Sequence, residues 1–219
     1  MSVMKRIILI LAVIAASLSC SRYEEVDSLP LKRQQIVLGV DDATRAYFES
    51  LGSAYRHYWE LGDKLSVFYR TNVNSEFTLA DGADTQRGVF EGEAASGLGE
   101  SIYVVYPYST QNSLADGVLS VNYPALQSLR ADKSSYDRQG LVMVACGVDG
   151  EMKMSNASSF VHLSLTGSNS ISKVELKAIG GEALVGAASV RFEGVEPVVA
   201  MVSEQSVVTV ECNAQLSDK

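Results

Sequence analysis

The stretch SKVELKA, residues 172–178, alternates apolar and charged side chains without a break. Val174, Leu176 and Ala178 fall on one side of an extended chain, and the intervening lysines and glutamate fall on the other. FVHLSLT, residues 160–166, repeats the pattern with Val161, Leu163 and Leu165 as its apolar face. Alternation with a period of two is typical of a half-buried antiparallel strand. Both stretches are therefore predicted to be strands.

Working outward from these two stretches, further runs rich in β-branched and aromatic residues recur along the chain and are separated by turns containing Gly or Asp. Asp149-Gly150 is a hairpin signal between one such run and EMKMS (residues 151–155). About ten short strands with turns between them predict an all-β fold, an antiparallel β-sandwich. The other runs are IVLGV (36–40), KLSVFYR (64–70), SIYVVYPY (101–108), GVLSVNY (117–123), LVMVACG (141–147), ASVRF (188–192) and SVVTVEC (206–212).

Residues 43–59 do not follow the strand pattern. Apolar and aromatic residues recur there at helical spacing, which favours an amphipathic helix. They are Tyr47, Leu51, Ala54 or Tyr55, and Tyr58. A strand, a turn at Leu51-Gly52-Ser53 and a second strand fit nearly as well, so the pattern leaves both alternatives open.

The N-terminus has the layout of a secretory signal. Lys5 and Arg6 precede an apolar run from Ile7 to Ala16, which is too short for a membrane span. Cys20 follows small residues and resembles the lipidated cysteine of bacterial lipoproteins, although Leu18 stands one place nearer to it than the usual pattern has. We expect a signal peptide at 1–19, a lipid on Cys20 and a polar tether at 20–35; the alternative is an ordinary secretory signal. Two acyl chains on one residue would give lasting attachment to a membrane.

Two acidic residues, Glu24 and Glu25, follow Cys20 closely. The cluster resembles the surface-export signal of lipoproteins from gut- and mouth-dwelling Gram-negative anaerobes. That resemblance implies attachment to the outer leaflet of the outer membrane. A solvated tether would also be polar and is the alternative interpretation.

The charge of the chain argues against one class of partner. The 219 residues carry a net charge of −8, and loss of Lys5 and Arg6 with the signal peptide gives −8 − 2 = −10. This acidity argues against nucleic acid as a partner.

Cys146 and Cys212 follow apolar runs and are predicted to be buried thiols, but their spacing does not decide whether they form a disulfide.

Catalytic and metal-binding motifs are missing from the sequence. It has two histidines, His57 and His162, and lacks a Gly-x-Ser-x-Gly elbow, a phosphate-binding glycine loop, a His-Glu-x-x-His helix and a Cys-x-x-Cys pair. Each histidine is expected to be a surface or boundary residue. We therefore predict a protein that is not an enzyme and has no cofactor and no metal site. The many carboxylates of this acidic chain leave a glycosidase pair as an open alternative.

Seven motifs occur in order along the chain: WELGDKLSVF (59–68), GVFEG (88–92), YVVYPYS (103–109), LQ (126–127), LVMVA (141–145), SFVHLSL (159–165) and ISKVELKAIGGEALVG (171–186). Together they resemble the fimbrillin-like family, the surface lipoproteins and pilus subunits of the same anaerobes. The similarity covers residues 36–212 and implies a β-sandwich of transthyretin-like topology. Family members usually have a second sandwich domain, and we expect residues 213–219 to be a truncated tail that stops before it.

The same motifs have physical interpretations. Trp59 is expected to anchor the core, and Gly62-Asp63 to turn the chain into the next strand. Pro107 should end or edge a strand because proline cannot donate to a ladder. Gly180-Gly181 should close a hairpin between VELKAI and ALVG.

The resemblance implies a structural function. In polymerising fimbrillins a trypsin-like protease cuts after an arginine near the N-terminus, and a strand from the next subunit fills the groove left by the lost first strand. Arg33 precedes the apolar run Ile36–Val40 and is the candidate cleavage site. We expect a surface-tethered anchor or accessory protein, with other fimbrial subunits as partners by strand exchange if Arg33 is cut. The alternative is a glycan-binding surface lipoprotein that uses Tyr103, Tyr106 and Tyr108.

Overall fold

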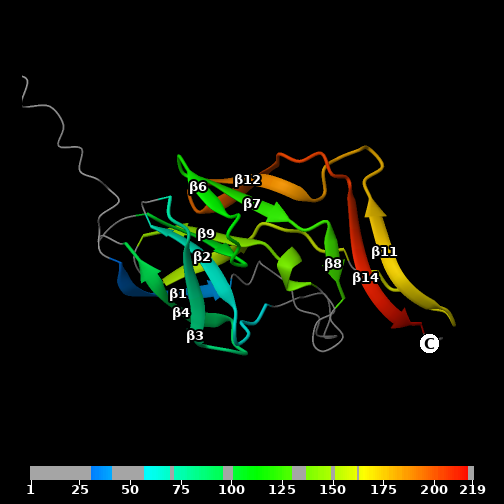
Figure 1. Cartoon of the computed structure of the whole chain (residues 1–219), viewed down its shortest axis with the longest axis horizontal. Coiled ribbons are helices and arrows are strands. Elements are labelled where there is room, and N and C mark those ends of the chain that lie inside the picture. The colour runs from blue at the N-terminus through cyan, green and yellow to red at the C-terminus, as the bar shows by residue number, and fades with distance from the viewer. Residues whose placement is uncertain are drawn as a thin grey trace, which may run out of the picture.

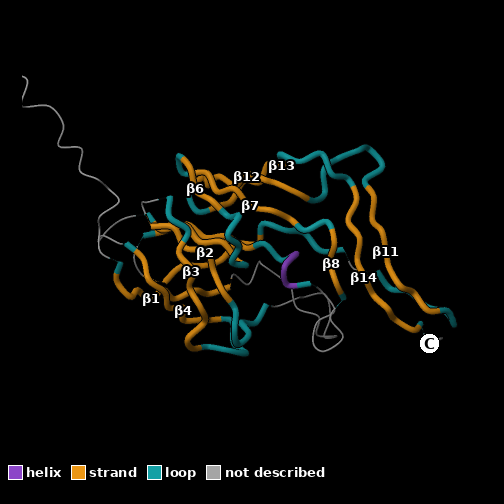
Figure 2. The backbone as a smooth tube through the Cα atoms, viewed as in Figure 1, coloured by secondary structure: helices purple, strands orange, loops and turns teal. Residues whose placement is uncertain are grey.

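The computed structural model describes residues 31–40, 57–69, 72–95, 101–129, 137–148, 151–161 and 163–216. Within these ranges the protein is all-β, as the sequence predicted. It has fourteen strands and one short 3-10 helix, Arg138–Gly140 (Figure 2). Residues 43–56, for which the sequence left both a helix and a pair of strands open, lie outside the described residues.

Seven strands form a closed sheet, called the barrel below. Their order around the barrel is β1-β10-β9-β5-β2-β3-β4, with β4 returning to β1 (Figure 1). The strands are β1 (Lys32–Val40), β2 (Lys64–Tyr69), β3 (Ser75–Asp81), β4 (Arg87–Ala94), β5 (Ile102–Tyr106), β9 (Met143–Gly147) and β10 (Glu151–Asn156).

The remaining strands form two smaller sheets. One has the order β13-β12-β7-β6 and comprises β6 (Ser113–Ala115), β7 (Val118–Tyr123), β12 (Gly186–Glu193) and β13 (Glu196–Met201). The other has the order β11-β14-β8 and comprises β8 (Leu126–Ser128), β11 (Ser170–Lys177) and β14 (Val207–Gln215). Figure 1 shows β11 and β14 as a long ribbon on the side of the molecule away from β1.

Two hydrophobic clusters hold the sheets together. The first lies within the barrel and includes Trp59, Phe77 and Phe90, all fully buried. The second lies between the outer face of the barrel at β2, β5 and β9 and the inner face of the four-stranded sheet, where Phe68 and Val105 meet side chains of β7 and β12. Because β2, β5 and β9 are covered on both faces, their sequences are almost continuously apolar instead of alternating.

Most local predictions are confirmed. All seven apolar runs outside the opening pair contain a strand, and β9 pairs with β10 in antiparallel fashion on either side of the predicted hairpin signal. Trp59 has no exposed surface, and Gly62 adopts a φ of 90° in the turn before β2. β5 ends at Tyr106, directly before Pro107.

Two strand pairs depart from the predicted antiparallel arrangement. β1 runs parallel to β10, and β8 runs parallel to β14. Strands so far apart in sequence have no hairpin to fix their relative direction, so tertiary packing decides it. The boundaries also differ from the sequence pattern, since β1 begins at Lys32 and β14 continues past Cys212 to Gln215.

Two predictions of secondary structure are wrong. The stretch 160–166 was expected to be a strand, but its described residues are in irregular structure, and Val161, Leu163 and Leu165 are 64%, 47% and 49% exposed. They border a cleft, so their alternation reflects a partly covered apolar surface and not a sheet. Gly180-Gly181 makes a turn but closes no hairpin, because β11 pairs with β14 while β12 pairs with β7 and β13.

Candidate assembly site

The first strand closes the barrel. β1 pairs with β4 antiparallel from Lys32 opposite Ala94 to Gly39 opposite Arg87. On its other side it pairs with β10 in parallel fashion, from Val37 opposite Glu151 to Val40 opposite Met154. Removal of β1 would therefore leave two strand edges facing each other across an open groove.

The side chains of β1 fill that groove. Ile36, Leu38 and Val40 point into the barrel and are 3%, 0% and 8% exposed, whereas the residues before Ile36 are exposed or half-buried. Burial of each such side chain contributes about 1.5–3 kcal/mol. Most of the stabilisation that β1 contributes to the fold therefore comes from its C-terminal half.

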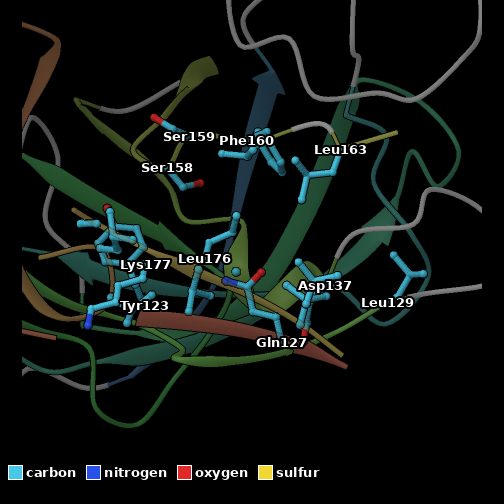
Figure 3. A pocket seen from close by; sticks show the side chains of 18 of the residues that line it. Tyr123, Gln127, Leu129, Asp137, Ser158, Ser159, Phe160, Leu163, Leu176 and Lys177 are labelled. Carbon is cyan, nitrogen blue, oxygen red and sulfur yellow. The ribbon is translucent and has the colours of Figure 1, made fainter. Parts of the chain in front are cut away.

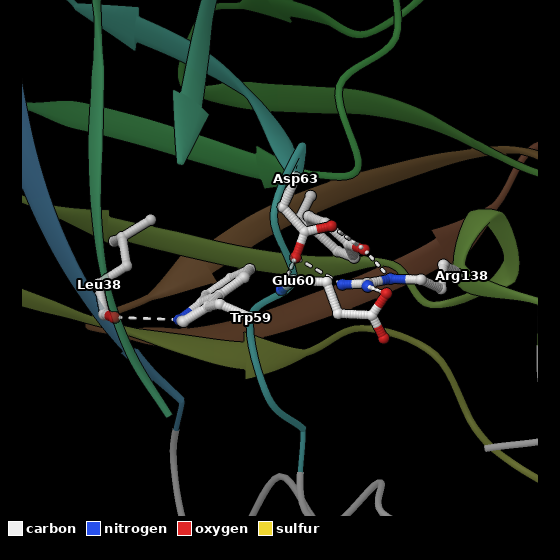
Figure 4. Close-up of polar contacts among 6 residues, drawn as sticks. Leu38, Trp59, Glu60, Asp63 and Arg138 are labelled. Carbon is white, nitrogen blue, oxygen red and sulfur yellow. Dashed lines mark hydrogen bonds and ion pairs between the residues drawn. The ribbon is translucent and has the colours of Figure 1, made fainter. Parts of the chain in front are cut away.

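Trp59 fastens β1 from within the barrel. Its indole Nε1–H donates to the carbonyl oxygen of Leu38 at 3.3 Å (Figure 4). Its ring packs edge-on against Phe90 of β4, with centroids 4.9 Å apart. The ring also lies against Gly88, where an added Cβ would stand 2.8 Å from Trp59 Cδ1, so glycine at this position admits the ring.

A buried polar cluster stands beside Trp59. The Arg138 guanidinium contacts Asp63 Oδ2 and Glu60 Oε2, each at 2.5 Å, and its Nε donates to the Tyr106 hydroxyl at 2.9 Å. The Tyr106 hydroxyl in turn donates to Asp63 Oδ1 at 3.1 Å, and the backbone N–H of Glu60 donates to Asp63 Oδ2 at 2.8 Å. Figure 4 shows Arg138 lying between Glu60 and Asp63. The cluster joins the turn before β2 to the 3-10 helix before β9.

Burial and charge set the protonation of this cluster. Burial alone would lower the pKa of Arg138, but the oxygens of Tyr106, Asp63 and Glu60 raise the pKa above its ordinary value. Burial raises the pKa of Asp63, while the Glu60 N–H and Arg138 act in the opposite direction. His57, which is 1% exposed, has its pKa lowered to about 3 by burial and by the charge of Arg138. The expectation that His57 is a surface or boundary residue is wrong, because it packs between Trp59 and Tyr106.

The structure places Arg33 inside β1 and not before it. Arg33 lies opposite Glu93 of β4, and its guanidinium forms an ion pair with Glu91 on the same strand. A protease that binds an extended peptide would first have to separate this end of β1 from β4. A cut after Arg33 would also leave Ile36, Leu38 and Val40 attached to the domain. Cleavage there would separate the residues before Gln34 from the barrel without opening the groove.

The remaining predicted site residues are distributed as follows. Cys20, Glu24 and Glu25 lie outside the described residues. Cys146 and Cys212 are free thiols. Both are half-buried, so the prediction of buried thiols is only partly met.

The three tyrosines proposed for glycan binding do not form a common platform. Tyr106 is 2% exposed and belongs to the polar cluster. Tyr103 points to the other face of β5, where its ring lies 5.9 Å from that of Phe192, and Tyr108 is half-buried. Stacking on a sugar requires exposed rings on one face, which this arrangement does not provide.

An apolar cleft of about 830 Å³ separates the β11-β14 ribbon from the segment around Phe160 (Figure 3). Several polar groups on its wall are already bonded within the protein. The Tyr123 hydroxyl donates to the Ala157 carbonyl at 2.6 Å, and the Asp137 carboxylate accepts from the N–H groups of Gln139 and Ser128, each at 2.9 Å. The apolar lining includes Phe160, Val161, Leu163, Leu165, Val174 and Leu176.

Sequence reasoning found Trp59 and Arg33 but missed Arg138 and the cleft. Arg138 and Asp63 are 75 positions apart in the sequence, and no local sequence pattern indicates that they form an ion pair. The apolar alternation of residues 160–166 was the available signal for the cleft, but it was interpreted as a strand.

Comparison with known proteins does not classify the chain. No family model, curated protein or solved structure matches it. Over the described ranges no helix has the length and apolar character needed to cross a membrane. Over the same ranges no three His, Cys, Asp or Glu side chains gather as metal ligands would.

Proposed function

We propose that the protein is a non-enzymatic cell-surface lipoprotein of the fimbrillin-like kind, anchored in the outer membrane by a lipid on Cys20. In this proposal it acts as an anchor or accessory component of a pilus and not as a polymerising subunit. The fold proposed with it is a β-sandwich of transthyretin-like topology. The packing of the barrel wall against the four-stranded sheet supports a two-layer arrangement.

One observation carries the proposal. A first strand lies between β4 and β10 and supplies Ile36, Leu38 and Val40 to the core. A strand held by two neighbours and three side-chain pockets is the arrangement that strand exchange requires, because ladder bonds give affinity and pockets give register. The position of Arg33 favours the anchored form over the polymer, since the buried half of β1 follows the arginine.

The anchor predicts a particular N-terminus. Protein from surface fractions should begin at a lipidated Cys20 when analysed by mass spectrometry, with no terminus at Gln34. Cys20→Ala should move the protein out of the detergent phase, because one residue carries the whole membrane attachment. A Gln34 terminus with high-mass ladders on gels would contradict the anchor role. Detergent-phase partitioning of the Cys20→Ala variant would contradict lipidation.

The acidic pair predicts which side of the membrane the protein faces. Glu24→Ala combined with Glu25→Ala should leave the protein lipidated but protected from a protease added to intact cells. The matched control is Glu204→Ala with Glu211→Ala, which removes the same charge far from the N-terminus. Equal digestion of the wild type and the Glu24/Glu25 variant would refute the export signal.

A further inference from the structure

β11 has an open edge. Among the described strands it pairs with β14 alone, and it is eight residues long. Figure 1 shows it as the outermost strand of its sheet. Ala178 N–H donates to the carbonyl of Ser206, the residue directly before β14, at 3.0 Å. Since bonding direction alternates along an antiparallel strand, the backbone groups of Lys173, Glu175 and Lys177 point away from β14.

The side chains along this edge alternate in charge. Lys173, Glu175 and Lys177 share the solvent face of β11 and are exposed. Lys173 Nζ and Glu175 Oε1 form an ion pair at 2.7 Å. On the opposite face, half-buried Val174 and Leu176 line the cleft. Lysines often protect a free edge from pairing, but here a glutamate between two lysines offers a complementary charge to an identical strand.

We propose that β11 pairs antiparallel with β11 of a second copy of this chain, with Val174 opposite Val174 of the second copy. In this register Lys173 lies opposite Glu175 of the second copy, and Glu175 opposite its Lys173. Opposite charges at directly facing positions stabilise a strand pair, and like charges destabilise it.

The two adjacent registers that also satisfy the backbone are less favourable. One places Lys173 opposite itself. The other places Glu175 opposite itself and Lys173 opposite Lys177. Both bring like charges together. The register centred on Leu176 does bring Glu175 opposite Lys177, but it pairs only residues 175–177 of the strand, whereas the register centred on Val174 pairs residues 171–177. Charge and strand overlap together therefore select the register centred on Val174. The resulting sheet is continuous through both copies in the order β8-β14-β11-β11-β14-β8, and the clefts of the two copies adjoin along it. This pairing does not depend on the proposed pilus role.

Charge exchange tests the register. The chain from residue 20 with Cys20→Ser should show concentration-dependent dimerisation in analytical ultracentrifugation. Lys173→Glu makes the edge acidic and Glu175→Lys makes it basic, so each variant alone should self-associate about tenfold more weakly, because both cross-strand charge pairs become repulsive. An equimolar mixture of the two variants should recover wild-type association, since every facing pair is again opposite in charge. A mixture no stronger than its components, or a wild type that stays monomeric to millimolar concentration, would overturn the proposal.

A cysteine in place of Val174, which faces its own copy in the proposed strand pair, gives an independent test of the pairing. Facing residues that are not hydrogen-bonded have Cα atoms about 4.5 Å apart, within the range for a disulfide. In a background with Cys20→Ser, Cys146→Ala and Cys212→Ala, the Val174→Cys variant should form a covalent dimer on mild oxidation. Val208→Cys is the matched control, because it lines the same cleft on β14, which is paired on both sides. Equal cross-linking of the two variants would show random collision and would refute pairing at β11.

Discussion

Replacing Arg138 with methionine is expected to lower the free energy of unfolding by about 3–5 kcal/mol, the usual cost of removing one partner from a buried ion pair. Arg138 is 14% exposed and forms ion pairs with both Asp63 and Glu60. Its loss therefore leaves two carboxylates beside the core without their cationic partner. The Tyr106 hydroxyl oxygen also loses the hydrogen bond that it accepts from Arg138 Nε. Urea titration followed by far-ultraviolet circular dichroism measures the change.

Two comparisons make this result specific. Arg87→Met removes an ion pair with Glu151 in which both side chains are more than half exposed, and it should cost less than about 1 kcal/mol. Arg138→Met combined with Asp63→Asn should cost less than the sum of the single changes, because the more buried of the two carboxylates that faced the arginine is then uncharged. A loss below about 1 kcal/mol for Arg138→Met would contradict the role of the cluster as a buried clamp.

The second large effect is a loss of stability in acid that depends on His57. The pKa of His57 is lowered from 6.5 to about 3, first by burial and second by the charge of Arg138. Between these two values the unfolded chain binds one more proton than the folded chain. The contribution of neutral His57 is therefore fully present above pH 6.5 and is lost as the pH falls toward 3. A shift of this size corresponds to a loss on the order of 3–5 kcal/mol.

The measurement compares urea unfolding of wild type and His57→Phe at pH 7 and at pH 4. The phenylalanine ring can keep the contacts with Trp59 and Tyr106 but cannot take up a proton. The variant should therefore lose less stability than the wild type between the two pH values. The raised pKa of Asp63 acts in the opposite sense in both proteins, so the difference between them isolates His57. If His162→Asn flattened the profile and His57→Phe did not, the assignment would be refuted.

The local structure was largely predictable because it depends on side chains close together in sequence. Alternation at residues 172–178 gave β11, and Gly62-Asp63 gave the turn before β2. Dense apolar runs gave β5 and β9, whose two faces are both covered. Strand propensity and turn chemistry operate over a few residues, and the sequence displays them directly.

The pairing of strands was not predictable in the same way. Adjacent runs suggested a hairpin at Gly180-Gly181, yet β11 and β12 joined different sheets. The same failure affected residues 160–166, where an alternating pattern belongs to the wall of a cleft. Alternation records that one face is apolar, but it does not identify what that face meets.

The sequence by itself determined that this protein is built from short strands and that Trp59 is a core residue. Attachment through Cys20 and export by the acidic pair stay predictions. Only the tertiary structure decided that β1 closes a barrel, that the buried half of β1 follows Arg33, and that Arg138 and Asp63 meet beside Trp59. The physical reason is the distance along the sequence over which each kind of interaction acts. A backbone preference depends on near neighbours, whereas strand order and buried ion pairs depend on which distant segments can exclude water together.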